Sequence, residues 1–341
     1  MGAWIGRSDH FDFSSQLAAP VGMTALTLLL PSARKLAATD GGRGWLDRLG
    51  QADRLPDQGA PLAALAGGVF TVVPSDFSEA AVRRHGEADD AGDGVWLCAD
   101  PCWLVAEPTG LRMMAGGAMQ LSALEAEDFA AVLAPIFGDA GIALRLGAPD
   151  HWYLQLPAGA ELPRFSPLRD VLGDDIERHL PVGKPGLRWR HLHNEVQMLL
   201  HQHRHNQRRA ERGLAPVNSL WFWGGGRLPN RVGCAQDQLL SDDLLVRGLA
   251  RLAAVPCSAV TSLAAALTLG PRVAVDLRDA SDLEALTNTW LLPALAALRH
   301  GPIRSLQCGF DSGECCRLRA WHRWRFWRRG WSPTTTAGGA R

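Results

Sequence analysis

The sequence lacks a long apolar run and an excess of charge of either sign. No apolar stretch approaches the roughly 20 residues that a helix needs to cross a bilayer, so we predict no transmembrane segment. Basic and acidic residues balance at 35 each, and Lys35 and Lys184 are the only lysines. A neutral chain has no general attraction for polyanions, which argues against nucleic acid as a partner.

A secretory leader and a disulfide framework are not indicated either. The first residues carry no apolar core and include Asp9 and Asp12, so we predict neither a signal peptide nor an anchor. The seven cysteines are odd in number, which fits a reduced, cytoplasmic interior. Met23 opens the first strand-like run and is an alternative start to Met1.

Length and composition predict a globular protein of one large or two medium domains. The 341 residues are 47% hydrophobic, which is enough to bury a core. Residues 157–185 are rich in Pro, Gly and Asp and mark a junction. We predict a disordered extension over 1–23, an N-terminal α/β half over 24–175, a C-terminal α/β half over 176–331 and a disordered tail over 332–341.

The order of apolar patterns predicts an α/β fold with a mixed β-sheet flanked by helices. Residues 94–108 are expected to form two short strands because Asp100-Pro101 interrupts them. Apolar spacing predicts one long helix from Leu187 to about Arg212. Other strands are expected over 24–30, 142–146, 151–156, 217–223 and 272–277, and helices near 44–50, 60–67, 122–140, 241–251, 258–268 and 281–299. A terminal hairpin turns at 311–313.

The segment after this helix combines arginines, tryptophans and glycines. Trp221 and Trp223 are two apart on a strand, so both indoles face one side. Glycines let the backbone approach a ligand, and arginines beside amides can form an anion site. The candidate ligand-binding residues are Asn206, Arg208, Arg209, Arg212, Asn218, Trp221, Trp223, Gly224, Gly225, Gly226 and Arg227. The alternative is a packed strand, a turn and a solvated helix end.

Residues 206–226 resemble the signature segment of archaeal-type, cofactor-independent phosphoglycerate mutases, with a similar asparagine, arginines, Pro-x-Asn and Trp-x-Trp-Gly-x-Gly. That resemblance implies part of the alkaline-phosphatase-like fold and a phosphorylated ligand. A wider resemblance is to the bacterial Rpf-cluster E-type regulatory proteins. It is carried by the segments 27–31, 99–111, 193–201, 218–229 and 321–329.

The chain departs from the mutases where they bind metal. Those enzymes need an N-terminal Asp-Gly segment, a nucleophilic serine and a C-terminal Asp and His set, because two divalent ions activate the serine. Here the first strand ends without an acid, and His300 and His322 are the only late histidines. We therefore predict a non-catalytic pseudoenzyme without a cofactor, whose partner is an unidentified protein or a phosphorylated small molecule. The alternative is an active mutase or phosphatase that uses Mn²⁺ or Mg²⁺ at Asp276 and Asp279.

Two further groups could bind metal. His201 and His205 have the i,i+4 spacing that zinc uses on a helix, but a solvated helix face is the favoured interpretation. Cys98 and Cys102 are separated by three residues, and we interpret them as small buried hydrophobic side chains.

The C-terminal segment, residues 317–331, holds six arginines, four tryptophans and no acid. This composition is typical of a membrane-surface helix or a stacking surface for nucleic acid. The favoured alternative is that the segment docks on the domain, with its tryptophans buried and arginines stacked on them.

Overall fold

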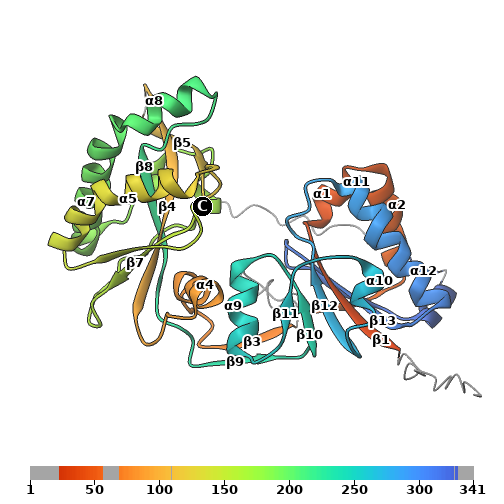
Figure 1. Ribbon diagram of the computed structural model, residues 1–341. Coiled ribbons are helices and arrows are strands. Elements are labelled where there is room, and N and C mark those ends of the chain that lie inside the picture. The colour runs from red at the N-terminus through yellow and green to blue at the C-terminus, as the bar shows by residue number, and fades with distance from the viewer. Residues whose placement is uncertain (1–22, 57–68, 109, 326, 329–341) are drawn as a thin grey trace, which may run out of the picture.

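The computed structural model describes residues 23–56, 69–108, 110–325 and 327–328. The predicted N-terminal extension up to residue 22, the predicted helix over 60–67 and the predicted tail lie outside these ranges. Figure 1 shows two lobes, each built around a β-sheet with helices beside it. The predicted mixed α/β class is therefore confirmed.

The larger sheet has seven strands in the order β11-β10-β12-β1-β13-β14-β2. Its central strand β1 pairs in parallel with β12 and β13, and β14 and β2 add an antiparallel edge. Helices cover one face of β1 along its length and cover the other face only at its later half, around Leu29, which fits its leucine-rich sequence. The bounds are β1 Thr24–Leu30, β2 Asp53–Leu55, β10 Gln238–Leu240, β11 Cys257–Ser258, β12 Arg272–Asp276, β13 Ile303–Phe310 and β14 Cys315–Leu318.

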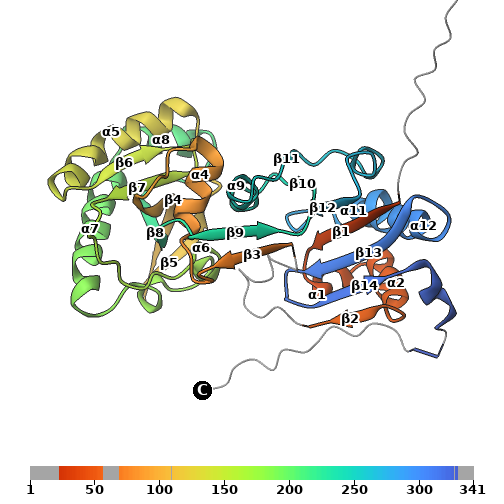
Figure 2. The same cartoon turned by 90° about the horizontal axis from the view of Figure 1, so that it is seen from below.

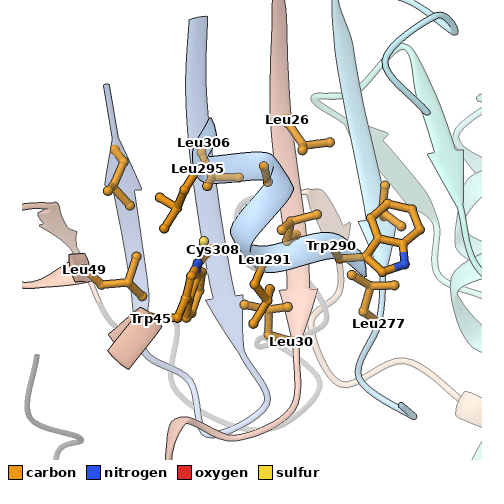
Figure 3. Close-up of a cluster of buried hydrophobic side chains, with 14 of the residues drawn as sticks. Leu26, Leu30, Trp45, Leu49, Leu277, Trp290, Leu291, Leu295, Leu306 and Cys308 are labelled. Atoms are coloured by element: carbon orange, nitrogen blue, oxygen red, sulfur yellow. The ribbon is translucent and has the colours of Figure 1, made fainter. Parts of the chain in front are cut away.

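One face of this sheet packs on a layer of helices. Leu26 and Leu30 of β1 meet Trp45, Leu291 and Leu306 in a buried cluster (Figure 3). The helices are α1 Ala33–Ala37, α2 Asp40–Leu49, α10 Leu263–Ala266, α11 Leu283–Leu286 and α12 Leu292–His300, with a π-helical turn Thr287–Leu291 before α12. On the opposite face, α9 (Leu244–Leu252) packs against the neighbouring side chains of β1, β10 and β12.

The smaller sheet has the order β5-β4-β7-β6, and β8 pairs with the other side of β4. Ser122 and Glu125 form a capping box at the start of α5, a helix that covers this sheet, as the sequence predicts. The strands are β4 Val95–Glu107, β5 Gly110–Gly116, β6 Ala143–Leu146, β7 Trp152–Leu156 and β8 Ser219–Gly226, and the helices are α5 Ala123–Asp139, α6 Leu168–Val171, α7 Gly183–His201 and α8 Arg204–Glu211, with a 3₁₀ turn Ile176–Arg178. The predicted halves, divided at 175/176, each contribute strands to both sheets.

Residues 95–107 form one strand, so the prediction of two short strands was wrong. Pro101 lies where β4 changes partners: β7 pairs up to Cys98 and β5 pairs from Cys102. The Pro101 carbonyl accepts a hydrogen bond from Gly117 on that same side. The proline nitrogen therefore faces the gap between the two partners, where no ladder donor is required.

The predicted long helix is two helices, α7 and α8, which corrects a second expectation. His203 caps α8 with its Nδ1, which accepts from the His205 amide at 3.4 Å. The Asn206 side chain donates to the Leu200 carbonyl at 2.8 Å and satisfies the end of α7. Because the helix is interrupted, His201 and His205 do not share the predicted face, and His205 Nε2 lies 2.7 Å from Asp128.

The lobes are joined by a two-stranded ribbon, β3 (Phe70–Val73) with β9 (Arg231–Cys234), and by helix α4 (Glu79–Ala88) (Figures 1 and 2). α4 crosses α9 with backbones in contact: a Cβ added to Gly86 would lie 2.5 Å from the Leu244 carbonyl oxygen, and one added to Gly248 2.0 Å from that of Val82. The opposite side of α4 packs on the cluster that contains Trp221 and Trp223. α4 thus fixes both lobes to each other.

The C-terminal segment docks through its arginines, but Trp321, Trp324 and Trp327 are exposed, contrary to the expected burial, and Trp331 lies outside the described residues. Arg325 donates to Asp53 at 2.5 Å, and Arg328 donates to the Ala52 carbonyl at 2.6 Å. Trp321 and Trp324, in or at the end of the 3₁₀ turn Ala320–Trp324, are 51% and 62% exposed. The described residues include no helix that is both long and apolar enough to cross a bilayer.

Candidate functional site

The guanidinium of Arg209 is engaged in hydrogen bonds within the protein. It is fully buried and donates to the Ala215 carbonyl at 2.8 Å, the Met119 carbonyl at 2.5 Å and Glu125 Oε1 at 3.3 Å. Asn206 closes the same connection, because Val217 both donates to its Oδ1 and accepts from its Nδ2 at 2.9 Å. These two predicted site residues hold the turn between α8 and β8.

The polar groups along β8 are engaged in the same way. Asn218 Oδ1 accepts from the Leu104 amide and its Nδ2 donates to the Leu104 carbonyl, both at 2.8 Å. The indoles of Trp221 and Trp223 belong to one buried cluster, as their spacing predicts. Trp221 Nε1 donates to the Ser166 carbonyl at 3.0 Å, and Trp223 Nε1 donates to Asp100 Oδ2 at 2.8 Å.

The glycines admit a neighbouring segment of the chain. A Cβ on Gly224, where φ is +68°, would lie 3.2 Å from Glu79 Cβ, and one on Gly226, where φ is +139°, 3.2 Å from Ser78 Cβ. Ser78 Oγ donates to the Gly224 carbonyl at 2.7 Å. The pliable backbone at the end of β8 therefore receives the first turn of α4.

The remaining predicted residues point away from a common centre. Arg208 and Arg212 are exposed, and Arg212 reaches Glu125 only at 3.9 Å. Arg227 donates to main-chain carbonyl groups of two loops, and a Cβ on Gly225 would meet Leu162 Cδ1 at 2.6 Å. The structure gathers the predicted set around β8 without placing its cations in one cavity.

A different group of charged side chains meets where α4 joins the lobes. Arg83 of α4 lies over the ring of Trp223, with its Cζ 5.1 Å from the ring centroid. Glu79, one turn earlier, lies 3.6 Å from Arg169, which belongs to α6. Asp243, the N-cap of α9, influences the ionisation of both Glu79 and Arg83. Sequence analysis missed this group because its members are far apart in the chain.

Arg83 has a hydrogen-bond donor that is not used within the described residues. Its Nε is buried and has no hydrogen-bond partner in the part of the chain that the structure describes. Burial opposes its charge, but Cys98, Asp100, Tyr153 and Asp243 raise its pKa. Burial raises the pKa values of the Asp100 and Glu79 carboxyl groups. The site therefore holds a permanent cation beside carboxyl groups that burial disposes toward the neutral form.

The edge of the larger sheet at the C-terminal ends of β10 and β12 faces this group and carries its own cluster of charged side chains. Arg278 follows β12 and clasps Asp276 with Nε and an Nη, both at 2.7 Å, and the same Nη lies 3.2 Å from Asp243 Oδ2. Ser241 Oγ donates to Asp276 at 3.0 Å. Partial burial is the main cause that raises the pKa of the Asp279 carboxyl group, and the nearby charge of Asp243 raises it further. Asp276 is thus committed to an internal cation.

Within the described ranges, no three His, Cys, Asp or Glu side chains are grouped so as to hold a metal ion. Cys98 and Cys102 are free and buried, as predicted. Burial raises the pKa values of both thiols, so neither is activated as a nucleophile.

His193 on α7 predicts an acid-sensitive fold. It is 2% exposed, its Nδ1 lies 2.8 Å from Gln197 Nε2 and its Nε2 3.2 Å from Ser219 Oγ, and burial lowers its pKa to about 4. Between the unfolded value of about 6.5 and the folded value, the unfolded state binds more protons, so stability falls as pH falls, by about 3 kcal/mol at most. Urea denaturation at several pH values across this window measures the effect. The free energy of unfolding should depend less on pH in His193→Gln than in wild type, and an unchanged dependence would contradict the assignment.

Comparison with known proteins gives a partial sequence match and a fold match. No family model matches the chain. The chain is 41% identical over 63 residues to a probable 2,3-bisphosphoglycerate-independent phosphoglycerate mutase of Geobacter sulfurreducens, covering 18% of this chain and 16% of the relative. It is 38% identical over 71 residues to the Methanosarcina mazei enzyme of that name, covering 21% and 18%. The chain therefore matches less than a fifth of the length of either relative.

Solved structures extend the comparison to most of the chain. The PH0037 protein of Pyrococcus horikoshii aligns over 91% of both chains with a TM-score of 0.50 and 12% identity. A cofactor-independent phosphoglycerate mutase of Thermoplasma acidophilum aligns over 87% of this chain and 90% of its own, with a TM-score of 0.39 and 15% identity. The chain has the fold of PH0037 and a distant sequence similarity to the mutases, which confirms that part of the predicted resemblance. The resemblance to Rpf-cluster proteins stays a prediction.

Proposed function

We propose that the chain binds a phosphorylated small acid of the phosphoglycerate class between its lobes and acts as a non-catalytic regulatory protein. The observation that carries the proposal is the guanidinium of Arg83. Its Nε has no hydrogen-bond partner within the described residues, and it lies beside the edge of the larger sheet where the C-terminal ends of the parallel strands meet. Ligands of open α/β sheets bind outside the carboxyl ends of the strands. A planar guanidinium is well matched to the oxygens of a phosphate or carboxylate.

The surroundings of Arg83 suit an anionic ligand. The ring of Trp223 supports the guanidinium plane, so little side-chain freedom remains to be lost on binding. Arg169 supplies a second cation, because its 3.6 Å contact with Glu79 is loose and its side chain is 46% exposed. The partial similarity to phosphoglycerate mutases supports a three-carbon phosphorylated acid as the ligand.

The absence of turnover in this proposal rests on Arg278. A two-metal phosphoryl transfer needs carboxylates that are free to bind divalent ions. Asp276 is held by both forks of Arg278, which also reaches Asp243. The alternative, an active mutase or phosphatase with Mn²⁺ or Mg²⁺ at Asp276 and Asp279, requires that Arg278 leave this position.

The regulatory role is supported by the predicted resemblance to Rpf-cluster E-type proteins. Such a role requires that ligand binding change the contact with a second protein, in the cytoplasm on this proposal. The narrow joint of α4 with α9 is suited to that task, because it carries Arg83 on one lobe and abuts the N-cap residue Asp243 on the other.

Arg83→Met tests the ligand site. In titration calorimetry with 3-phosphoglycerate and a metal chelator, we expect wild type to bind and the variant to bind about 10- to 100-fold more weakly, the value of a hydrogen bond to a charged group. Arg208→Met removes the same charge at an exposed position and should bind like wild type. Equal affinity of the two variants, or no binding by wild type, would overturn the proposal.

A further inference from the structure

Within the residues that the structure describes, part of one face of the larger sheet is not covered by helices. On this face, α9 covers the parts of β1 and β12 around Leu29 and Ala274. The N-terminal halves of β1 and β13 lie beyond α9. Side chains alternate along a strand, so Thr27, Ser305 and Arg317 face this side while their neighbours enter the core. A groove of about 600 Å³ opens here (the strands can be followed in Figure 2).

The groove is basic. Among the described residues that line it, none is acidic and four are arginines: Arg272, Arg304, Arg317 and Arg319. Arg272 is neutralised by Asp237 at 2.5 Å, whereas Arg317 donates to the neutral amide oxygen of Gln307 at 2.8 Å and keeps its net charge. Arg304 and Arg319 are exposed. About three positive charges therefore face the groove without an acidic partner in its lining.

An aromatic platform continues from the end of this groove. Arg319 lines the groove, and Trp321 follows two residues later, within about 7 Å along the chain. Arg325 covers one face of Trp321, with Cζ 4.4 Å from the ring centroid, and Arg323 lies 5.1 Å over Trp324. Both rings are more than half exposed, although Arg325 anchors the segment to Asp53. The docking thus presents the rings to solvent on a fixed support.

We propose that this surface binds single-stranded nucleic acid, with phosphates in the arginine groove and bases stacked on Trp321 and Trp324. A basic groove joined to exposed aromatic rings is the arrangement that binds single strands without sequence preference. A membrane interface would meet the tryptophans on a flat surface and leave the arginines that line the groove unused. The site lies on the larger lobe, is independent of the phospho-ligand proposal, and replaces the expectation from net charge that nucleic acid is no partner.

Fluorescence anisotropy of the full chain with labelled oligothymidine of about twelve nucleotides tests this inference. We expect binding in low salt that weakens roughly 20-fold between about 50 and 200 mM salt, because about three phosphate contacts give a log–log slope near −2. The double variant Arg304→Ser/Arg319→Ser should bind at least about tenfold more weakly and with a shallower slope. Trp321→Ala/Trp324→Ala should lose at least about tenfold with the slope kept.

Arg34→Ser/Arg208→Ser provides the matched control, since it removes two exposed arginines outside the surface and should bind like wild type. Thermal melts of all variants should coincide, because each changed side chain is exposed. No binding by wild type in low salt, equal affinity of every variant, or binding to phosphatidylserine vesicles without binding to the oligonucleotide would each overturn the inference.

Discussion

Arg209→Met is expected to destabilise the protein by about 3–5 kcal/mol, the cost of breaking a buried ion pair by removing one partner. The change removes the Arg209 donors from Glu125 Oε1 and from the carbonyl groups of Met119 and Ala215. Glu125 also belongs to the capping box of α5, so the loss reaches the start of that helix. Methionine has a similar length and fills the space, which keeps the cavity contribution small.

Urea denaturation at neutral pH measures this loss directly. Arg208→Met is the matched control, because its side chain is exposed on the same helix, and it should change stability by less than about 0.5 kcal/mol. A similar small effect of Arg209→Met would show that the guanidinium is not the clamp between α8 and β8. The residue would then be available to a ligand, as the sequence pattern suggests.

Gly248→Ala is expected to cost about 1–3 kcal/mol or more by overpacking, because the added Cβ would lie 2.0 Å from the Val82 carbonyl oxygen. A backbone atom cannot rotate aside, so α9 must move away from α4. Gly44→Ala in α2 is the control: its Cβ meets nothing within 4 Å, and the change should stabilise the helix by up to about 1 kcal/mol.

Thermal melts followed by tryptophan fluorescence compare the two alanine variants. If Gly248→Ala melts at or above the wild-type temperature, the close crossing of α4 and α9 is wrong. Because α4 carries Arg83, the Gly248 variant should also bind 3-phosphoglycerate more weakly, whereas Gly44→Ala should not. That difference ties the joint between the lobes to the ligand site.

Local patterns were sufficient to predict much of the fold. β1 is a leucine-rich strand that ends before Pro31, and Ser122 with Glu125 forms the predicted capping box. Pro101 misled the prediction because a proline is compatible with a strand wherever its nitrogen faces a gap, and that gap depends on which strands pair with β4. The break between α7 and α8 depends on Asn206, which bonds to Val217 across the following turn.

The candidate site could be predicted only in part, for a physical reason. An arginine that clamps carbonyl groups and one that awaits an anion are the same residue in a sequence. Arg209 and Arg83 differ in what the fold places around them: carbonyl groups for the first, and a tryptophan ring for the second. The signal that could have drawn attention to Arg83 is the pair Gly86 and Gly248, since glycines within helices often mark close crossings.

Phosphorus NMR of 3-phosphoglycerate with the full chain tests the central claim most directly. The ligand is incubated with the protein and Mn²⁺, the metal is then removed with a chelator, and the spectrum is recorded. We expect a shifted or broadened 3-phosphoglycerate resonance that Arg83→Met restores to its free position, with no signal of 2-phosphoglycerate. A 2-phosphoglycerate signal that grows with time would contradict the non-catalytic assignment, and an unperturbed resonance with wild type would contradict the ligand site.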